Sequence, residues 1–197
     1  FASGEWHNND IVLDFENNKI YYTVTLKSNG TKRLDNYEYS VDLSSITTVT
    51  GINLYGWSGD AYYDNFLIEY VEEPAFNPTI WEEDFEGEAT LASRVDSASA
   101  GAVIEDGVLK TPSEVEVYVN SKNGVVADAP LGKICVNFDM KAPYVGTAAT
   151  GVELYTDAGK KALIYYGTWG GLRPHATNGE YGASFEGDVW YNNDFVL

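Results

Sequence analysis

Hydrophobic and polar residues alternate along most of this chain of 197 residues. In residues 20–26 (IYYTVTL), apolar side chains recur at every second position from Ile20 to Leu26. A two-residue period is typical of a β-strand with one buried face. The same alternation occurs in residues 115–119 and 134–140. Comparable apolar runs predict further strands at residues 10–16, 33–41, 50–56, 61–71, 80–86, 107–111, 150–156, 161–168 and 188–197.

Turn-forming residues separate these segments. Residues 16–19 (ENNK), 28–31 (SNGT) and 157–160 (DAGK) have the composition of hairpin tips. The one helical feature that we expect is a single turn near residues 88–93. Many short strands joined by such turns predict an all-β fold, namely a two-sheet antiparallel β-sandwich of the jelly-roll type with almost no helix.

The two ends of the chain resemble each other. Residues 1–13 (FASGEWHNNDIVL) and 185–197 (FEGDVWYNNDFVL) are identical at seven of thirteen positions, including a Trp and an Asn-Asn-Asp run, with a period of 184 residues. A period of 20–50 residues would indicate a solenoid or a propeller, whereas this one indicates domain-sized tandem copies. The alternative is a chance similarity between two strands of one fold.

A domain boundary is expected where two prolines interrupt the strand pattern, within residues 72–79 (EEPAFNPT). Residues 1–72 would then form the C-terminal part of one repeat, and residues 73–79 a linker. Residues 80–197 would form the N-terminal part of the next repeat, or of the same repeat in a circularly permuted order.

Three segments in this order resemble the opening of a laminin-G-like, concanavalin-A-like jelly roll: residues 82–87 (EEDFEG), 105–110 (EDGVLK) and 151–157 (GVELYTD). Residues 10–27 and 51–70 are similar to its closing part. The resemblance implies an extracellular recognition or structural module, often one of several on a large surface protein. Some relatives bind glycans, and a few are glycoside hydrolases.

Composition narrows the set of partners. Thirty acidic residues against twelve basic ones give a formal net charge of −18, which disfavours nucleic acid and anionic membranes as ligands. No apolar run approaches the length of a membrane span, and residues 1–6 lack the features of a signal peptide. The single cysteine, Cys135, excludes an internal disulfide.

We do not expect catalysis. The hydrolase relatives carry their acids in a Glu-x-Asp-x-x-Glu pattern on one strand, and this chain has no such pattern. The two histidines, His7 and His175, have no nucleophile motif near them. His7 also corresponds to Tyr191 in the second copy, which argues against a role as an essential base. A glycoside hydrolase is therefore the least favoured function.

A structural calcium ion is a candidate cofactor. In many jelly rolls the first and last strands of the domain lie side by side, and acids from both can bind calcium through their oxygens. The corresponding residues are Asp84 and Glu86 on one strand and Asp60 and Asp64 on the other. The alternative is that these acids cap turns or remain solvated.

Glycan binding is the second candidate function, because exposed aromatic rings stack on sugars. The loop around residues 165–175 contains Trp169, Arg173 and His175, and Tyr55 and Trp57 form a second group. The alternative is that the tryptophans fill the core.

The repeated ends suggest a route to assembly. Residues 6–13 and 190–197 would compete for one position in the sandwich, so that the surplus strand is available to complete a neighbouring copy. We therefore expect a non-catalytic structural or adhesive repeat of an extracellular or cell-surface protein, with further copies as its partners; a carbohydrate-binding module is the alternative. The proposed assembly residues are Trp6, Asn8, Asn9 and Asp10 in one copy and Trp190, Asn192, Asn193 and Asp194 in the other.

Overall fold

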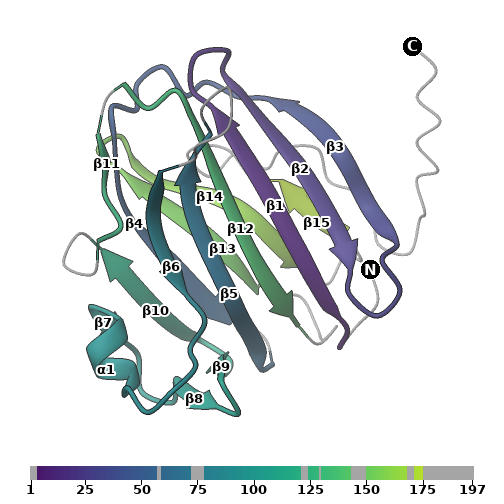
Figure 1. Ribbon diagram of the computed structural model, residues 1–197, viewed down its shortest axis with the longest axis vertical. Helices are drawn as coiled ribbons and strands as arrows, with labels where there is room; N and C mark the ends of the chain where they lie inside the picture. The colour runs from purple at the N-terminus through teal and green to yellow at the C-terminus, as the bar shows by residue number, and fades with distance from the viewer. Residues whose placement is uncertain are drawn as a thin grey trace.

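Two antiparallel sheets pack face to face and confirm the prediction of an all-β sandwich. The computed structural model describes residues 4–56, 59–71, 78–120, 124–128, 130–142, 150–167 and 171–174. In Figure 1 the larger sheet lies in front, and the strands of the smaller sheet cross behind it. The arrangement is compatible with a jelly roll.

The larger sheet has eight strands in the order β3-β2-β1-β12-β5-β9-β8, with β6 also paired to β5. Its strands are β1 (Trp6–Asp14), β2 (Lys19–Leu26), β3 (Lys32–Ser40), β5 (Ala61–Tyr70), β6 (Thr79–Glu83), β8 (Val103–Glu105), β9 (Val108–Thr111) and β12 (Lys133–Lys141).

The smaller sheet has seven strands in the order β15-β14-β13-β4-β10-β7, with β11 beside β4. Its strands are β4 (Thr48–Gly56), β7 (Ser97–Ala98), β10 (Val115–Asn120), β11 (Ala127–Asp128), β13 (Thr150–Thr156), β14 (Gly159–Gly167) and β15 (Gly171–Pro174). The helix of the described chain is one turn, α1 (Leu91–Arg94), close to the predicted one.

The predicted strands within the described residues form, with two clear differences in their bounds. The strand expected over residues 10–16 is β1, which begins four residues earlier, at Trp6, and ends at Asp14. The strand expected over residues 80–86 ends at Glu83, and Phe85 beyond its end adopts a left-handed backbone conformation with φ of 55°. Strands β7, β8, β11 and β15 were not predicted, since two to four residues show no periodicity. The strand predicted at residues 188–197 lies outside the described residues.

Alternation along the strands fills the space between the sheets with apolar side chains. On the larger sheet, Phe66 packs against the ring of Phe138 in a stacked pair with centroids 5.1 Å apart, and against Trp81 at 5.7 Å. All three side chains are buried. This aromatic cluster joins β5, β6 and β12 into one core.

Strands from the two predicted segments alternate within both sheets. β1 and β5, from residues 1–72, both pair with β12, and β4 lies between β10 and β13. β5 and β6 lie side by side, with Ile68 opposite Trp81. Buried residues of both segments, from Ile11 to Leu154, therefore belong to one hydrophobic core. No helix in the described part of the chain is long and apolar enough to cross a membrane.

Candidate functional site

Strand β1, which contains the first copy of the repeated motif, occupies a central position in the larger sheet. It pairs with β12 from Trp6 opposite Lys141 to Asp14 opposite Lys133. On its other side it pairs with β2, from His7 opposite Leu26. Because both edges of β1 are hydrogen-bonded, removing it would separate β2 from β12 and expose two unpaired strand edges. We call this position the β1 slot.

The inward-facing residues of β1 include two polar side chains. Ile11 and Leu13 are buried in the core, and so are His7 and Asn9 at 1% and 0% exposure. The corresponding residues of the second copy are Tyr191, Asn193, Phe195 and Leu197. Asn9 and Leu13 are unchanged in the second copy. His7 is replaced by another ring, Tyr191, and Ile11 by another large apolar residue, Phe195.

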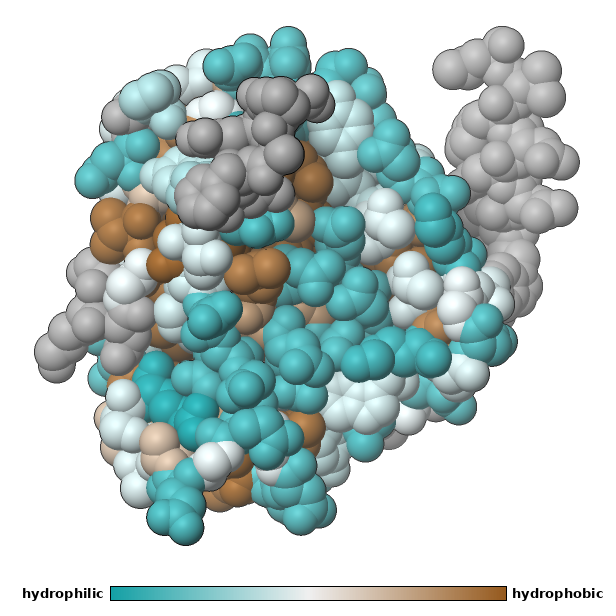
Figure 2. Space-filling model, viewed as in Figure 1, coloured by the Kyte–Doolittle hydropathy of each residue, from teal (hydrophilic) through white to brown (hydrophobic). Residues whose placement is uncertain are grey.

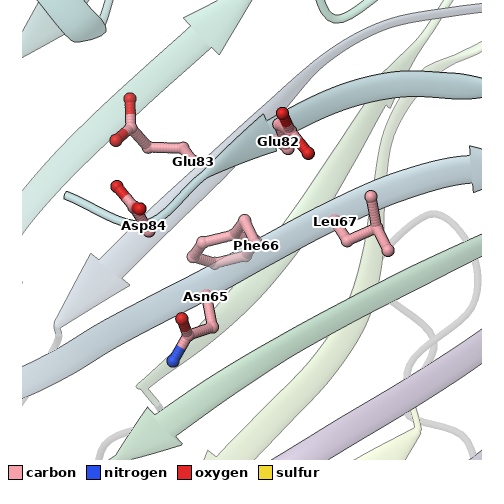
Figure 3. A pocket seen from close by; sticks show the side chains of 6 residues that line it. All are labelled: Asn65, Phe66, Leu67, Glu82, Glu83 and Asp84. Carbon is pink, nitrogen blue, oxygen red and sulfur yellow. The ribbon is translucent and has the colours of Figure 1, made fainter. Parts of the chain in front are cut away.

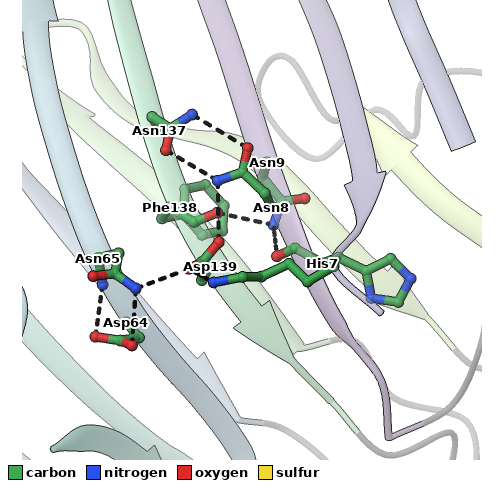
Figure 4. Close-up of polar contacts among 9 residues, drawn as sticks. His7, Asn8, Asn9, Asp64, Asn65, Asn137, Phe138 and Asp139 are labelled. Carbon is green, nitrogen blue, oxygen red and sulfur yellow. Dashed lines mark hydrogen bonds and ion pairs between the residues drawn. The ribbon is translucent and has the colours of Figure 1, made fainter. Parts of the chain in front are cut away.

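Asn9 places a buried amide between β1 and β12. Its amide nitrogen Nδ2 donates to the backbone oxygen of His7 at 3.2 Å and to that of Phe138 at 3.4 Å (Figure 4). These two acceptors satisfy a polar group that would otherwise be costly to bury in the core. Asn193 offers the same amide in the second copy.

Asn8 connects β1 to a buried carboxylate on the outer face of the larger sheet. Its Nδ2 donates to Asn137 Oδ1 at 3.1 Å and to Asp139 Oδ1 at 3.0 Å (Figure 4). Asp139 is only 3% exposed, and it also accepts from Asn65 Nδ2 at 2.8 Å and pairs with Lys27. The charge of Asp139 is thus satisfied by one ammonium and two amides.

The two remaining predicted assembly residues of β1 also contact β12. The thiol of Cys135 donates to Asp10 Oδ1 at 3.0 Å, and burial raises the pKa of this thiol well above its ordinary range. The ring of Trp6 lies 5.3 Å from Lys141 Nζ. All four predicted residues of the first copy therefore contact β12. Their counterparts Trp190, Asn192, Asn193 and Asp194 lie outside the described residues.

His7 is held as a neutral imidazole. Burial lowers its pKa from 6.5 to about 4, although its Nδ1 lies 3.0 Å from the backbone oxygen of Glu5, a contact that favours the protonated form. The charge of Arg33 on β3 lowers the pKa further. His7 thus serves as a packed core residue, and the equivalence to Tyr191 is consistent with that.

An acidic pocket of about 440 Å³ lies where β5 and β6 run side by side (Figure 3). The lining residues are Asn65, Phe66, Leu67, Glu82, Glu83 and Asp84. Glu83 accepts from the backbone N–H of Phe85 at 2.7 Å and pairs with Arg94. Asp84 accepts from the backbone N–H of Glu86 at 3.0 Å. Both acids are therefore engaged in shaping the chain that leaves β6.

Of the four predicted calcium ligands, Asp84 lines this pocket and Asp64 lies close by. Burial raises the pKa of Asp64, and the charges of Asp139 and Glu86 raise it further. Asp60 instead pairs with Lys110 at 3.1 Å. Among the described residues, no three His, Cys, Asp or Glu side chains are grouped to hold a metal ion. Calcium binding stays a prediction.

One residue of each predicted glycan-binding group lies in the same row of strand positions in the smaller sheet, and of these two the Tyr55 side chain is buried. Tyr55 on β4 is opposite Gly151 on β13, Gly151 is opposite Tyr165 on β14, and Tyr165 is opposite Arg173 on β15. The sequence placed Tyr55 and Arg173 in separate candidate groups. Trp57, Trp169 and His175 lie outside the described residues.

Several residues that complete the site were not predicted, namely Lys27, Tyr62, Asn65, Asn137, Asp139 and Lys141. For Asn137, Asp139 and Lys141 the signal in the sequence is the polar set of alternating positions in residues 133–141, which marks the outer face of β12 but not its partners. No protein-family model and no curated protein matches this chain.

Proposed function

We propose that this chain is a non-catalytic structural repeat of an extracellular or cell-surface protein, and that it joins neighbouring copies by strand complementation. The second copy of the repeated motif, residues 190–197, would enter the β1 slot of the next module. The observation that carries this proposal is that Trp6, Asn8, Asn9 and Asp10 all contact β12, and that all four recur unchanged in the second copy.

The pattern of identity supports the proposal. Asn8 recognises one register through the side chains of Asn137 and Asp139 on β12, and Asn9 finds a backbone acceptor there, so a strand that carries both amides is matched to this slot rather than to any apolar groove. Positions 7 and 11 differ between the copies, but both are inward-facing and keep a ring or a large apolar group. Changes of that kind are tolerated when the volume of the core is nearly conserved.

The geometry of a single slot and two matching strands leads to head-to-tail contacts. Because each slot holds one strand, residues 190–197 enter the slot of a neighbour by replacing its β1, as in donor-strand complementation. Such contacts are heterologous and form an open filament unless their rotation closes a ring. A net charge of −18 would keep modules apart where no specific contact forms.

Cys135 provides a direct test. It lies opposite Val12 in the β1–β12 register, and Val12 corresponds to Val196 in the second copy. In the full chain carrying Val196→Cys, the introduced thiol would lie opposite Cys135 of a neighbour whenever residues 190–197 occupy the β1 slot. Oxidation with diamide should then produce covalent dimers and higher multimers that disappear on reduction.

The matched control is Asn192→Cys. Its counterpart Asn8 is opposite Asp139, four residues along β12 from Cys135, so that this thiol should not cross-link. Equal yields from the two variants would contradict the proposal. The mass of the oxidised product shows whether the disulfide lies within one chain or joins two. A disulfide within single chains alone would mean that residues 190–197 fill the β1 slot of their own chain, without assembly, and would also contradict the proposal.

A further inference from the structure

A second feature of the larger sheet is a row of side chains that crosses three strands on its outer face. Trp6 on β1 is opposite Lys141 on β12, and Lys141 is opposite Tyr62 on β5. The ammonium of Lys141 lies 4.2 Å from the centroid of the Tyr62 ring and 5.3 Å from that of Trp6. All three residues are partly exposed. Figure 2 views this face, which is largely hydrophilic.

Lys141 differs from the five other lysines whose side chains the structure describes. All five form ion pairs with carboxylates, whereas Lys141 has none in the described part of the chain; the five are Lys19, Lys27, Lys32, Lys110 and Lys133. The chain contains 30 acidic residues for 12 basic ones, so an unmatched ammonium is unexpected. Asp139, two residues earlier on the same face, is already occupied by Lys27 and the amides of Asn8 and Asn65.

Such a row matches the chemistry of one class of ligand. An aromatic ring stacks on the apolar face of a sugar ring, and an ammonium forms a charge-assisted hydrogen bond with a carboxylate. Attraction to the two rings holds Lys141 in place between them, and no carboxylate of the described residues forms an ion pair with it. We propose that Trp6, Tyr62 and Lys141 bind a uronic-acid unit of an acidic saccharide, with its carboxylate on Lys141.

The charge of the whole protein opposes an anionic ligand, but the charges around the row are largely compensated. Asp139 pairs with Lys27, while Asp60 and Glu105 share Lys110. The ammonium of Lys110 also lies 5.8 Å from the ring of Tyr62. Charges farther away than about 8 Å are screened at physiological ionic strength. We therefore expect a short uronate oligomer to bind more tightly, per sugar unit, than a long polyanion.

This binding site is independent of strand complementation, because the described chain already contains all three residues. The repeat offers a second tryptophan, Trp190, at the position equivalent to Trp6. If residues 190–197 of a neighbour replace β1, Trp190 would supply the aromatic ring in place of Trp6. Saccharide binding can accordingly be tested on the protein in whatever state of association it adopts.

Calorimetric titration of the full chain with trigalacturonate tests the proposal, with cellotriose as the neutral probe. We expect trigalacturonate to bind with a dissociation constant at or below the millimolar range, about 10⁻³ M, and cellotriose to bind at least about tenfold more weakly. Lys141→Gln should weaken trigalacturonate binding about tenfold, and Lys141→Arg should largely retain it. The matched control is Lys32→Gln, which removes the same charge from an exposed pair with Asp35 on β3.

Two aromatic variants separate the role of the ring from that of the charge. Tyr62→Phe keeps the ring and should bind as the wild type does, whereas Tyr62→Ala should lose binding. Three outcomes would overturn the proposal: no binding of trigalacturonate to the wild type, an equal loss in Lys141→Gln and Lys32→Gln, or equally tight binding of cellotriose. None of them bears on the cross-linking of residue 196 to Cys135.

Discussion

The hydroxyl of Tyr63 donates to the backbone oxygen of Tyr55 at 2.8 Å and thereby joins the two sheets through the middle of the core. The same hydroxyl lies 2.9 Å from the backbone oxygen of Gly151. Tyr63 belongs to β5 of the larger sheet, and the two acceptors belong to β4 and β13 of the smaller one. Its side chain is fully buried. A single hydroxyl thus links the strands on either side of the core where the two sheets face each other.

Removing this hydroxyl should destabilise the sandwich without changing its fold. For Tyr63→Phe we expect the free energy of unfolding to fall by about 1–2 kcal/mol, because a buried hydrogen bond is lost while the ring stays in place. Urea denaturation followed by tryptophan fluorescence measures the change. Tyr62→Phe, one residue away on the outer face, is the control and should change stability by less than about 0.5 kcal/mol. Equal effects would contradict the assigned role.

Lys27 and Asp139 should behave as a coupled pair. Lys27→Met leaves a carboxylate that is 3% exposed without its cation, so the free energy of unfolding should fall by about 1–3 kcal/mol. In the double variant with Asp139→Asn, most of that loss should be recovered, because no buried charge remains. A double-mutant cycle by urea denaturation gives the coupling energy. Strictly additive losses would show that the two side chains act independently.

His7 should make stability depend on pH below about 6.5. Its pKa is about 4 in the folded chain and 6.5 when exposed, so between these values the unfolded chain takes up a proton that the folded chain does not. Stability therefore falls as pH decreases from 6.5 toward 4, by at most about 1.4 kcal/mol per pH unit from this group. Below pH 4 both states are protonated, and the contribution stops changing.

His7→Tyr tests this pH dependence, since tyrosine is the residue at the corresponding position 191. Thermal denaturation of the variant between pH 7 and pH 4 should show a smaller loss of stability than the wild type. His175→Gln, which changes the other histidine of the chain, should leave the wild-type dependence in place. If His7→Tyr follows the wild-type curve, the buried imidazole is not the cause.

Asp64 is the best probe of the predicted calcium site. Its pKa is raised by burial and by the charges of Asp139 and Glu86, so its ionised form weakens the fold above its folded pKa, and this cost vanishes at pH values below its unfolded pKa. Asp64→Asn should therefore not reduce stability at pH 7. Calcium chloride should raise the melting temperature of the wild type, and less so that of the variant. The absence of any shift in the wild type, relative to magnesium chloride, would contradict the calcium prediction.

The sequence was sufficient to predict the local structure and the direction of each side chain within a strand. Alternation of apolar residues marked β2, β10 and β12, and the Asn- and Gly-containing turns marked the hairpins, because both signals depend on neighbours a few residues apart. It also revealed the repeated motif at the two ends. Short strands such as β7 and β11, of two residues each, carry no such signal.

The tertiary structure decided which strands are neighbours, and thereby the composition of the sites. Asn8 and Asp139 are separated by 131 residues, and alternation shows only that each faces away from the core. Their contact arises because β1 packs between β2 and β12. Lys141 likewise acquires two aromatic neighbours only through the register of three strands that are distant in sequence. Which strands pair depends on how all of them pack around the shared core, and no pattern of neighbouring residues encodes that.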